Sequence, residues 1–218
     1  MNWGWIPRNT GPIIGLLGQH VVLALLPVLI GLVLAVPLGW LATRSRIARA
    51  VLVPAAGLFY TIPSLALFIA LPFVLGTKIL DPINVVVALA IYTTALLVRS
   101  VADALAAVPS MVIAAATAMG YKSGRRFAQV ELPLSVPVLI AGLRVAMVTN
   151  ISLVAVGALI GIGGLGFFFT DGFIRANTIE IITGLVLVLV IALVFDLVLV
   201  AIGRRATPWV TAGEGSRA

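Results

Sequence analysis

Five apolar runs, each close to the length of a bilayer-crossing helix, dominate this sequence. They lie at about residues 21–41, 51–75, 82–98, 136–162 and 179–202. A helix needs roughly 20 mainly apolar residues to cross the hydrocarbon core of a membrane. Only helices and closed barrels satisfy their backbone hydrogen bonds there. The runs therefore predict an all-α integral membrane protein with about five transmembrane helices.

The composition excludes a soluble globular domain. Of the 218 residues, 62% are hydrophobic and only 10% are charged, too few polar groups to cover a water-exposed surface. We expect the lipid bilayer as a partner and no nucleic acid, because the basic residues are dispersed at the ends of apolar runs. Cysteine is absent, so no disulfide or thiolate metal site is expected.

The basic residues also predict an orientation. With five spans, three of them (Arg8, Lys78 and Arg175) fall on one side of the membrane. The other eleven fall on the opposite side: Arg44, Arg46, Arg49, Arg99, Lys122, Arg125, Arg126, Arg144, Arg204, Arg205 and Arg217. The positive-inside rule then places the N-terminus outside and the C-terminus in the cytoplasm, as a multi-pass protein of the plasma membrane.

The two ends of the chain flank a transmembrane domain predicted over residues 19–203. Residues 1–18 read as an interfacial segment anchored by Trp3 and Trp5 rather than as a secretory signal. Residues 204–218 read as a disordered cytoplasmic tail. His20 is expected to be a wetted interfacial histidine rather than a proton switch, because no titratable partner is near it in sequence.

Residues 109–133 form the one sizeable segment between spans, and we expect a helix–turn–helix hairpin there. Pro109 suits a first helical turn, three alanines follow at 114–116, and Gly120 permits a sharp turn. Ser123 is the expected N-cap of a second short helix over 124–131, which should stop before Pro133. A large soluble partner could grip such a hairpin.

The same segment resembles a known motif. Six residues at fixed spacing are similar to the "EAA" coupling motif of bacterial ABC-importer permeases: Ala115, Ala116, Gly120, Val130, Leu132 and Pro133. The family pattern has Glu where this chain has Ala114, which removes one polar contact in docking. In that family the first helix of the motif sits in a groove of the ATP-hydrolysing subunit. The alternative is an ordinary cytoplasmic loop.

Two further segments are similar to osmoprotectant permeases, those for glycine betaine, carnitine and choline. YTIPSLAL at residues 60–67 resembles their QTIPSLAL. Pro63 should kink the second span and free carbonyls close to Thr61 and Ser64. Two interpretations stay open: a polar notch that lines the translocation path, or a kink satisfied by the two hydroxyls.

IGIGGLG at residues 160–166 resembles the IGAGGLG of those permeases. It also fits G-x-G-x-x-G, but a dinucleotide loop requires a preceding strand within a βαβ unit, whereas an apolar span precedes this one. We expect a flexible exit from the fourth span into an outer loop over 167–177.

Polar residues within the spans are candidates for function because lipid exposure would be costly. Asn150 and Ser152 should face a partner helix or a pore, of which we favour the pore. Arg144 and Asp196 lie at comparable depths in the fourth and fifth spans, and we expect them to neutralise each other near the inner gate.

The resemblance, which covers residues 20–203, implies the type I ABC-importer permease fold. The function it implies is a permease subunit for osmoprotectants or quaternary amines. Implied partners are ABC ATPase subunits, a second permease copy or paralogue, and an extracytoplasmic solute-binding protein. No Walker A motif, catalytic cluster or metal-ligand cluster occurs, so the chain should not be an enzyme and should bind no cofactor, ATP and Mg²⁺ being held by the ATPase. The alternatives are an importer permease for an amino acid such as methionine, or a non-ABC membrane scaffold or channel.

Overall fold

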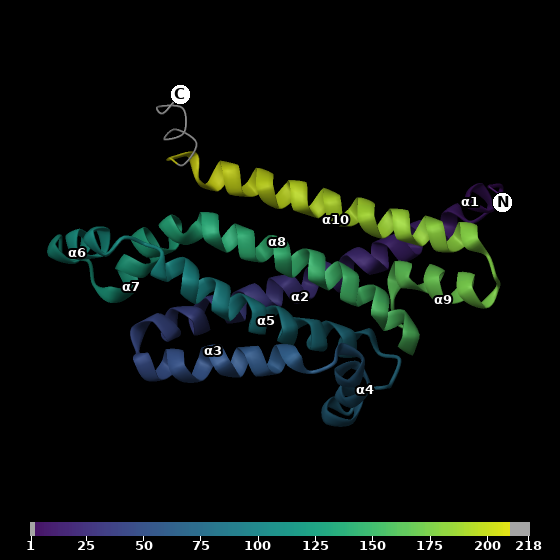
Figure 1. Cartoon of the computed structure of the whole chain (residues 1–218), viewed down its shortest axis with the longest axis horizontal. Helices are drawn as coiled ribbons and strands as arrows, with labels where there is room; N and C mark the ends of the chain where they lie inside the picture. Colours follow the sequence, from purple (N-terminus) through teal and green to yellow (C-terminus); the bar gives the residue numbers. More distant parts are fainter. Residues whose placement is uncertain (1–2, 210–218) are drawn as a thin grey trace.

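A computed structural model describes residues 3–209, which are helical with short connections and contain no strand (Figure 1). The longer helices are α2 (Thr10–Arg44), α3 (Arg46–Thr61), α4 (Ser64–Leu75), α5 (Pro82–Ala106), α8 (Leu132–Val156) and α10 (Thr178–Ala206). The shorter segments are α1 (Trp5–Arg8), α6 (Ser110–Ala118), α7 (Ser123–Arg126), the π-helix η1 (Phe127–Glu131), the 3₁₀ turns η2 (Gly157–Ile160) and η3 (Gly164–Gly166), and α9 (Phe167–Ile174).

The centre of the bundle is the packing of α2 against α5 and of α5 against α8. Small residues allow the first of these contacts. A Cβ placed on Gly39 of α2 would lie 2.5 Å from the Cβ of Val101 on α5, and one on Gly31 would meet Thr93 at the same distance. Membrane helices use such small residues because lipid supplies no hydrophobic force to bring helices together.

Four helical segments in the described residues are long and apolar enough to cross a membrane: α2, α5, the segment that contains α8, and α10. The pair α3 and α4 makes a fifth span if it is counted as one, so the prediction of about five spans holds with one of them broken. The first span is longer than predicted, because α2 already begins at Thr10. Residues 10–18, predicted to be an interfacial segment, are therefore helical.

The second span is broken rather than kinked. Helices α3 and α4 meet at 100°, and Ile62 and Pro63 both have extended backbones. The proline ring disfavours a helical conformation at the residue before it, which explains the extended Ile62. The carbonyl of Ile62 accepts a hydrogen bond from the Tyr92 hydroxyl of α5. The kink predicted at Pro63 is thus a complete break, and the second span consists of two helices rather than one kinked helix.

The glycine-rich segment after α8 is tightly packed, so the prediction of a flexible exit was wrong. Residues 162–166 are buried. A Cβ on Gly163 would lie 2.2 Å from the amide nitrogen of Ala158, and one on Gly166 would lie 2.3 Å from the carbonyl oxygen of Ala155. The predicted outer loop that follows instead contains helix α9, which packs against α10.

The bundle has one strongly basic end. The C-terminal ends of α2, α5 and α10 lie there together with α6 and α7, whereas α1 and α9 lie at the opposite end (Figure 1). Arg44, Arg99, Arg126 and Arg205 all belong to this basic end. The predicted disordered tail reaches beyond residue 209 and lies largely outside the described residues.

Candidate functional site: the hairpin at the basic end

The hairpin over residues 109–133 turns at Gly120. Its φ of +83° lies in the left-handed region that favours glycine. The amide of Tyr121 donates to the carbonyl of Ala116, and the amide of Gly120 donates to that of Thr117. These two bonds form a Schellman motif, which ends α6 and reverses the chain.

The second half of the hairpin differs from the prediction. Helix α7 starts with Ser123 itself after Lys122, so Ser123 is not the N-cap. The helix also does not stop before Pro133. It passes through the π-helix η1, where the amide of Leu132 donates to the carbonyl of Phe127, and continues into α8. Pro133 follows the π-helix directly, at the second position of α8, so the second arm of the hairpin and this span form one continuous helical segment.

Helix α6 presents a mostly apolar surface at the tip of this end. Met111 and Met119 are 81% and 71% exposed, and the Ala114 and Ala115 side chains also face outward. Ala116 is only 2% exposed and packs against the rest of the chain. The two alanines of the motif therefore differ, one facing outward and the other holding α6 in place.

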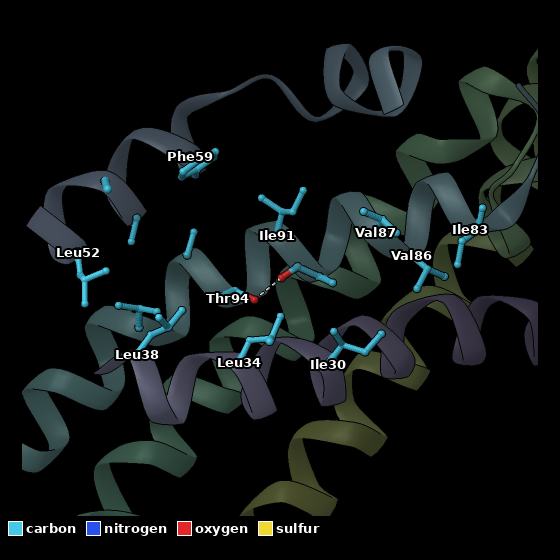
Figure 2. Close-up of a pocket in the computed structure, with 15 residues that line it drawn as sticks. Ile30, Leu34, Leu38, Leu52, Phe59, Ile83, Val86, Val87, Ile91 and Thr94 are labelled. Atoms are coloured by element: carbon cyan, nitrogen blue, oxygen red, sulfur yellow. Dashed lines mark hydrogen bonds between the residues drawn. The ribbon is translucent and has the colours of Figure 1, made fainter. Parts of the chain in front are cut away.

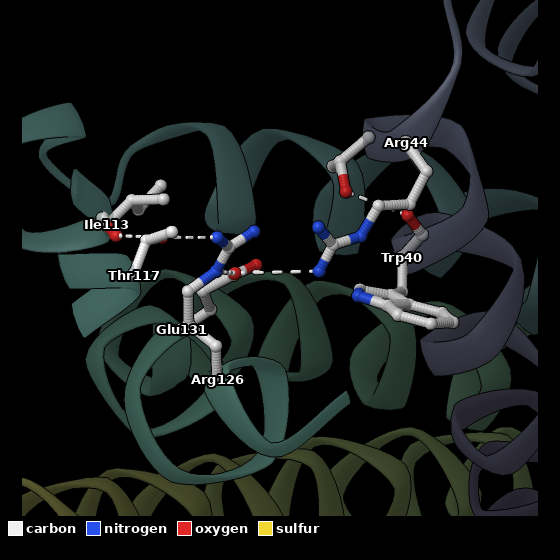
Figure 3. Close-up of polar contacts among 7 residues, drawn as sticks. Trp40, Arg44, Ile113, Thr117, Arg126 and Glu131 are labelled. Carbon is white, nitrogen blue, oxygen red and sulfur yellow. Dashed lines mark hydrogen bonds and ion pairs between the residues drawn. The ribbon is translucent and has the colours of Figure 1, made fainter. Parts of the chain in front are cut away.

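A buried carboxylate, Glu131, ties the hairpin to the first span (Figure 3). Its side chain is 7% exposed and accepts a hydrogen bond from Nε of Arg126 at 2.6 Å. Its Oε1 also lies 3.5 Å from Nη2 of Arg44, at the end of α2. Arg126 in turn donates from Nη1 to the Thr117 hydroxyl of α6 at 2.7 Å. One acid thus links α6, the π segment and α2.

Aromatic packing reinforces this link. The Trp40 and Phe127 rings lie 5.1 Å apart between centroids, and the Arg44 guanidinium lies 4.9 Å from the Trp40 ring. The ring pair joins α2 to the hairpin, whereas the cation–π contact lies within α2; such contacts are worth about 0.5–1 kcal/mol when exposed and more when desolvated. The end of α2 is therefore held to the base of the hairpin by both charge and packing.

Comparison with known proteins identifies the kind of molecule that carries this hairpin. Residues 22–211 match the family described as "Binding-protein-dependent transport system inner membrane component". The chain belongs to this family.

The relatives that the chain resembles are permeases of similar length. It is 33% identical over 203 residues to "Osmoprotectant import permease protein OsmW" of Salmonella typhimurium, with 92% of this chain and 94% of that protein covered. It is 28% identical over 204 residues to "Glycine betaine/carnitine/choline transport system permease protein OpuCB" of Bacillus subtilis, with 94% and 93% covered. Its fold is similar to a chain of the MetNI methionine ABC transporter in an inward-facing conformation, with TM-score 0.82, 24% identity and 92% and 98% coverage. The type I importer permease fold is thereby shown.

The predicted intramembrane ion pair of this family member is present. Arg144 of α8 donates from Nε to one oxygen of Asp196 on α10 at 2.6 Å and from Nη2 to the other at 2.8 Å. The two parallel bonds match the planar guanidinium to the carboxylate. Helix α10 packs chiefly on α8 and α9, so this pair fixes how α10 sits on the bundle.

The other polar candidates fall into two places. Thr61, Pro63 and Ser64 lie together at the α3–α4 break, where the Thr61 hydroxyl donates to the carbonyl of Leu58. Asn150 is buried and donates from its side-chain nitrogen to the hydroxyl of Thr93 on α5 at 2.7 Å. Asn150 thus faces a partner helix, not a pore as we favoured.

The structure separates Ser152 from Asn150, since Ser152 is exposed. Two adjacent residues of α5 connect the α3–α4 break with Asn150. The Tyr92 hydroxyl donates to the carbonyl of Ile62 at the break, and the Thr93 hydroxyl accepts from Asn150.

His20 is the residue that the sequence placed most wrongly. It is fully buried rather than wetted. Its Nδ1 accepts a hydrogen bond from the amide of Leu165 at 3.2 Å, and its Nε2 lies 3.0 Å from the carbonyl oxygen of Ile151, which fits a donated bond. These partners lie 145 and 131 positions away in sequence, so no local signal could have indicated them. His20 joins α2, α8 and the glycine-rich turn.

Sequence reasoning also missed the role of Glu131. The sequence did contain one signal for that role. This chain has Ala114 where the motif has an acid, but it has an acid at position 131 within the same hairpin.

Proposed function

We propose that this chain is the permease subunit of an ABC importer for osmoprotectants of the quaternary-amine class. The names of OsmW and OpuCB and their near full-length alignment with this chain support the solute class. The similarity of residues 60–67 and 160–166 to segments of osmoprotectant permeases supports this solute class as well. In the structure these two segments form the α3–α4 break and the packed glycine-rich turn.

The observation that carries the coupling role is the attachment of α6 to two spans at once. Glu131 links the hairpin to α2 through Arg44, and the unbroken helix from α7 through η1 links it to α8. We propose that a movement of α6 is passed to both spans through these two links. We propose that two partner ATPase subunits, which bind ATP and Mg²⁺, supply this movement and that the chain itself hydrolyses nothing.

The same proposal sets the orientation. The basic end faces the cytoplasm, by the positive-inside rule, and α6 is then accessible to a cytoplasmic ATPase. The opposite end, with α1 and α9, faces outward and receives solute from an extracytoplasmic binding protein. A second permease copy or paralogue completes the pore.

Within the half-pore we propose that the α3–α4 break lines the translocation path. Thr61, Pro63 and Ser64 lie there, and the Tyr60 and Tyr92 rings meet edge-on at 5.9 Å. Aromatic faces attract quaternary ammonium groups. With only this pair of tyrosines at the break, most of the solute selectivity belongs to the binding protein.

The decisive experiment is uptake by proteoliposomes that contain this chain, its ATPase and its binding protein. We expect ATP-dependent accumulation of labelled glycine betaine, choline or carnitine, and none of labelled methionine. ATP-dependent uptake of methionine alone would replace the solute class and keep the importer. Passage of solute without ATP would instead favour a channel.

A further inference from the structure

We propose that the chain binds one anionic phospholipid at its basic end, with the phosphate in an arginine-lined pocket and an acyl chain in an adjoining apolar groove.

The pocket lies between the α2–α3 turn and the start of α6 and encloses about 400 Å³. Four arginines and one acid are among its lining residues: Arg44, Arg46, Arg49, Arg126 and Glu131. Arg44 and Arg126 share Glu131, and Arg49 pairs with Asp103. Arg46 has no ion-pair partner within residues 3–209. The pocket therefore holds a clear excess of positive charge.

Neutral donors add to this preference for an anion. The pocket reaches the first turns of α3 and α6, where backbone amides at the positive ends of the helix dipoles favour negative charge. The hydroxyl of Ser110, which also lines the pocket, has no hydrogen-bond partner among the described residues. Guanidinium groups together with hydroxyl and amide donors are the set that recognises phosphate.

The groove lies between α2, α3 and α5 and encloses about 600 Å³ (Figure 2). Every lining residue is apolar except Thr94, and the Thr94 hydroxyl is already bonded to the carbonyl of Ala90. Leu34 and Leu38 lie on its α2 side and Phe59 on its α3 side (Figure 2). Such a surface suits a hydrocarbon chain and offers nothing to a polar solute.

The groove and the pocket follow the same face of each helix. On α2 the groove residue Leu38 precedes the pocket residue Ala42 by one turn, and on α3 the groove residue Leu52 follows Arg49 by one turn. On α5 the groove residue Val98 lies two turns before the pocket residue Leu105. Residues spaced by three, four or seven positions share a helix face. A single amphiphile can therefore occupy both hollows.

An anionic phospholipid fits this arrangement better than the alternatives. A free phosphate would leave the groove unused, and a helix of a second permease copy would offer no anion to the arginines. The arginines also lie near the ends of helices that are long and apolar enough to cross a membrane, where basic residues attract anionic lipid headgroups. This inference concerns the permease alone and does not depend on which solute is transported.

The test is native mass spectrometry of the purified full chain, titrated with phosphatidylglycerol, with phosphatidylcholine of the same acyl chains, or with sodium phosphate. We expect one phosphatidylglycerol to be retained more tightly than phosphatidylcholine. Arg46→Gln should weaken its retention about fivefold, in line with the usual contribution of one basic residue near anionic lipid. Ala55→Phe should weaken retention of both lipids by filling the groove.

Matched controls are Arg205→Gln, at the same end but outside the pocket, and Ala201→Phe, exposed on α10. Neither should change retention, and circular dichroism should show unchanged helicity in all four variants. Equal retention of the two lipids would overturn the proposal. So would equal loss in Arg205→Gln and Arg46→Gln, displacement of the lipid by sodium phosphate alone, or efficient cross-linking of two copies through a cysteine at position 55.

Discussion

The carboxylate of Glu131 and the guanidinium of Arg126 meet at 2.6 Å across the π-helical segment of the hairpin. They are five residues apart, the spacing that the i→i+5 bonding of a π-helix brings to one face. Such π segments are rare and are frequently found at functional sites, and this one lies where the hairpin joins α2 and α8.

Glu131→Gln should uncouple transport. The substitution leaves Arg126 and Arg44 without their shared counter-charge, and the loss of a hydrogen-bonded buried charge costs roughly 1–3 kcal/mol. We expect ATP-dependent uptake in proteoliposomes to fall at least about tenfold, because the hairpin would be held less firmly to α2. A fall of that size corresponds to a free energy within this range. Asp103→Asn, which removes an exposed acid at the same end, is the control and should retain most uptake.

Exchanging the two charges of the Arg144–Asp196 pair should preserve their interaction. Either single reversal places two like charges side by side within the membrane, where an unpaired charge costs up to about 3 kcal/mol. Asp196→Arg and Arg144→Asp should each lower resistance to unfolding by dodecyl sulfate, and the double variant should recover most of it. If the double variant is no more stable and transports no better than either single one, the pair has no role in packing α10.

Gly164 should tolerate no side chain. Its φ is +47°, and a Cβ there would lie 2.7 Å from the Cβ of His20 and 2.8 Å from its backbone nitrogen. Gly164→Ala should therefore lower the thermal unfolding temperature in detergent, at a cost of roughly 1–3 kcal/mol or more. Gly57→Ala is a matched control in helix α3 with open space around its Cβ, and it should be neutral or slightly stabilising. Equal melting of the two variants would contradict the packing described.

The Tyr92 hydroxyl should stabilise the broken span. Tyr92→Phe removes the donor to the carbonyl of Ile62 and should cost about 1 kcal/mol, with faster proteolysis between α3 and α4. Tyr60→Phe is the matched control, because the Tyr60 hydroxyl makes no hydrogen bond to any residue between 3 and 209, while its ring packs on Tyr92. Uniform proteolysis in both variants would show that the break does not depend on this bond.

The parts of the molecule that the sequence predicted are those set by local chemistry. Apolar length predicted the spans, Gly120 predicted the turn of the hairpin, and the cost of unpaired charge in lipid predicted the partnership of Arg144 and Asp196. The 100° break at Pro63 was predicted only as a kink, because its angle depends on Tyr92, 30 residues away.

The errors arose where long-range contacts decide the structure. His20 is buried only because Leu165 and Ile151 supply its partners, and the glycine-rich turn is rigid because His20 and Ala155 pack against it. Asn150 faces Thr93 because α5 and α8 happen to align these two residues. Sequence periodicity carries no information on such pairings, which join residues 57 to 145 positions apart.

The most direct test of the central claim uses the absence of cysteine from the chain. Ala115→Cys introduces a single thiol on the outward face of α6, and Lys78→Cys introduces one at the opposite end. After treatment with a short thiol-to-amine cross-linker in native membranes, we predict that the ATPase subunit is joined to the chain through residue 115 only, to an extent that changes when ATP is added. Cross-linking of the ATPase through residue 78, or ATP-driven uptake without any ATPase contact at residue 115, would contradict the account.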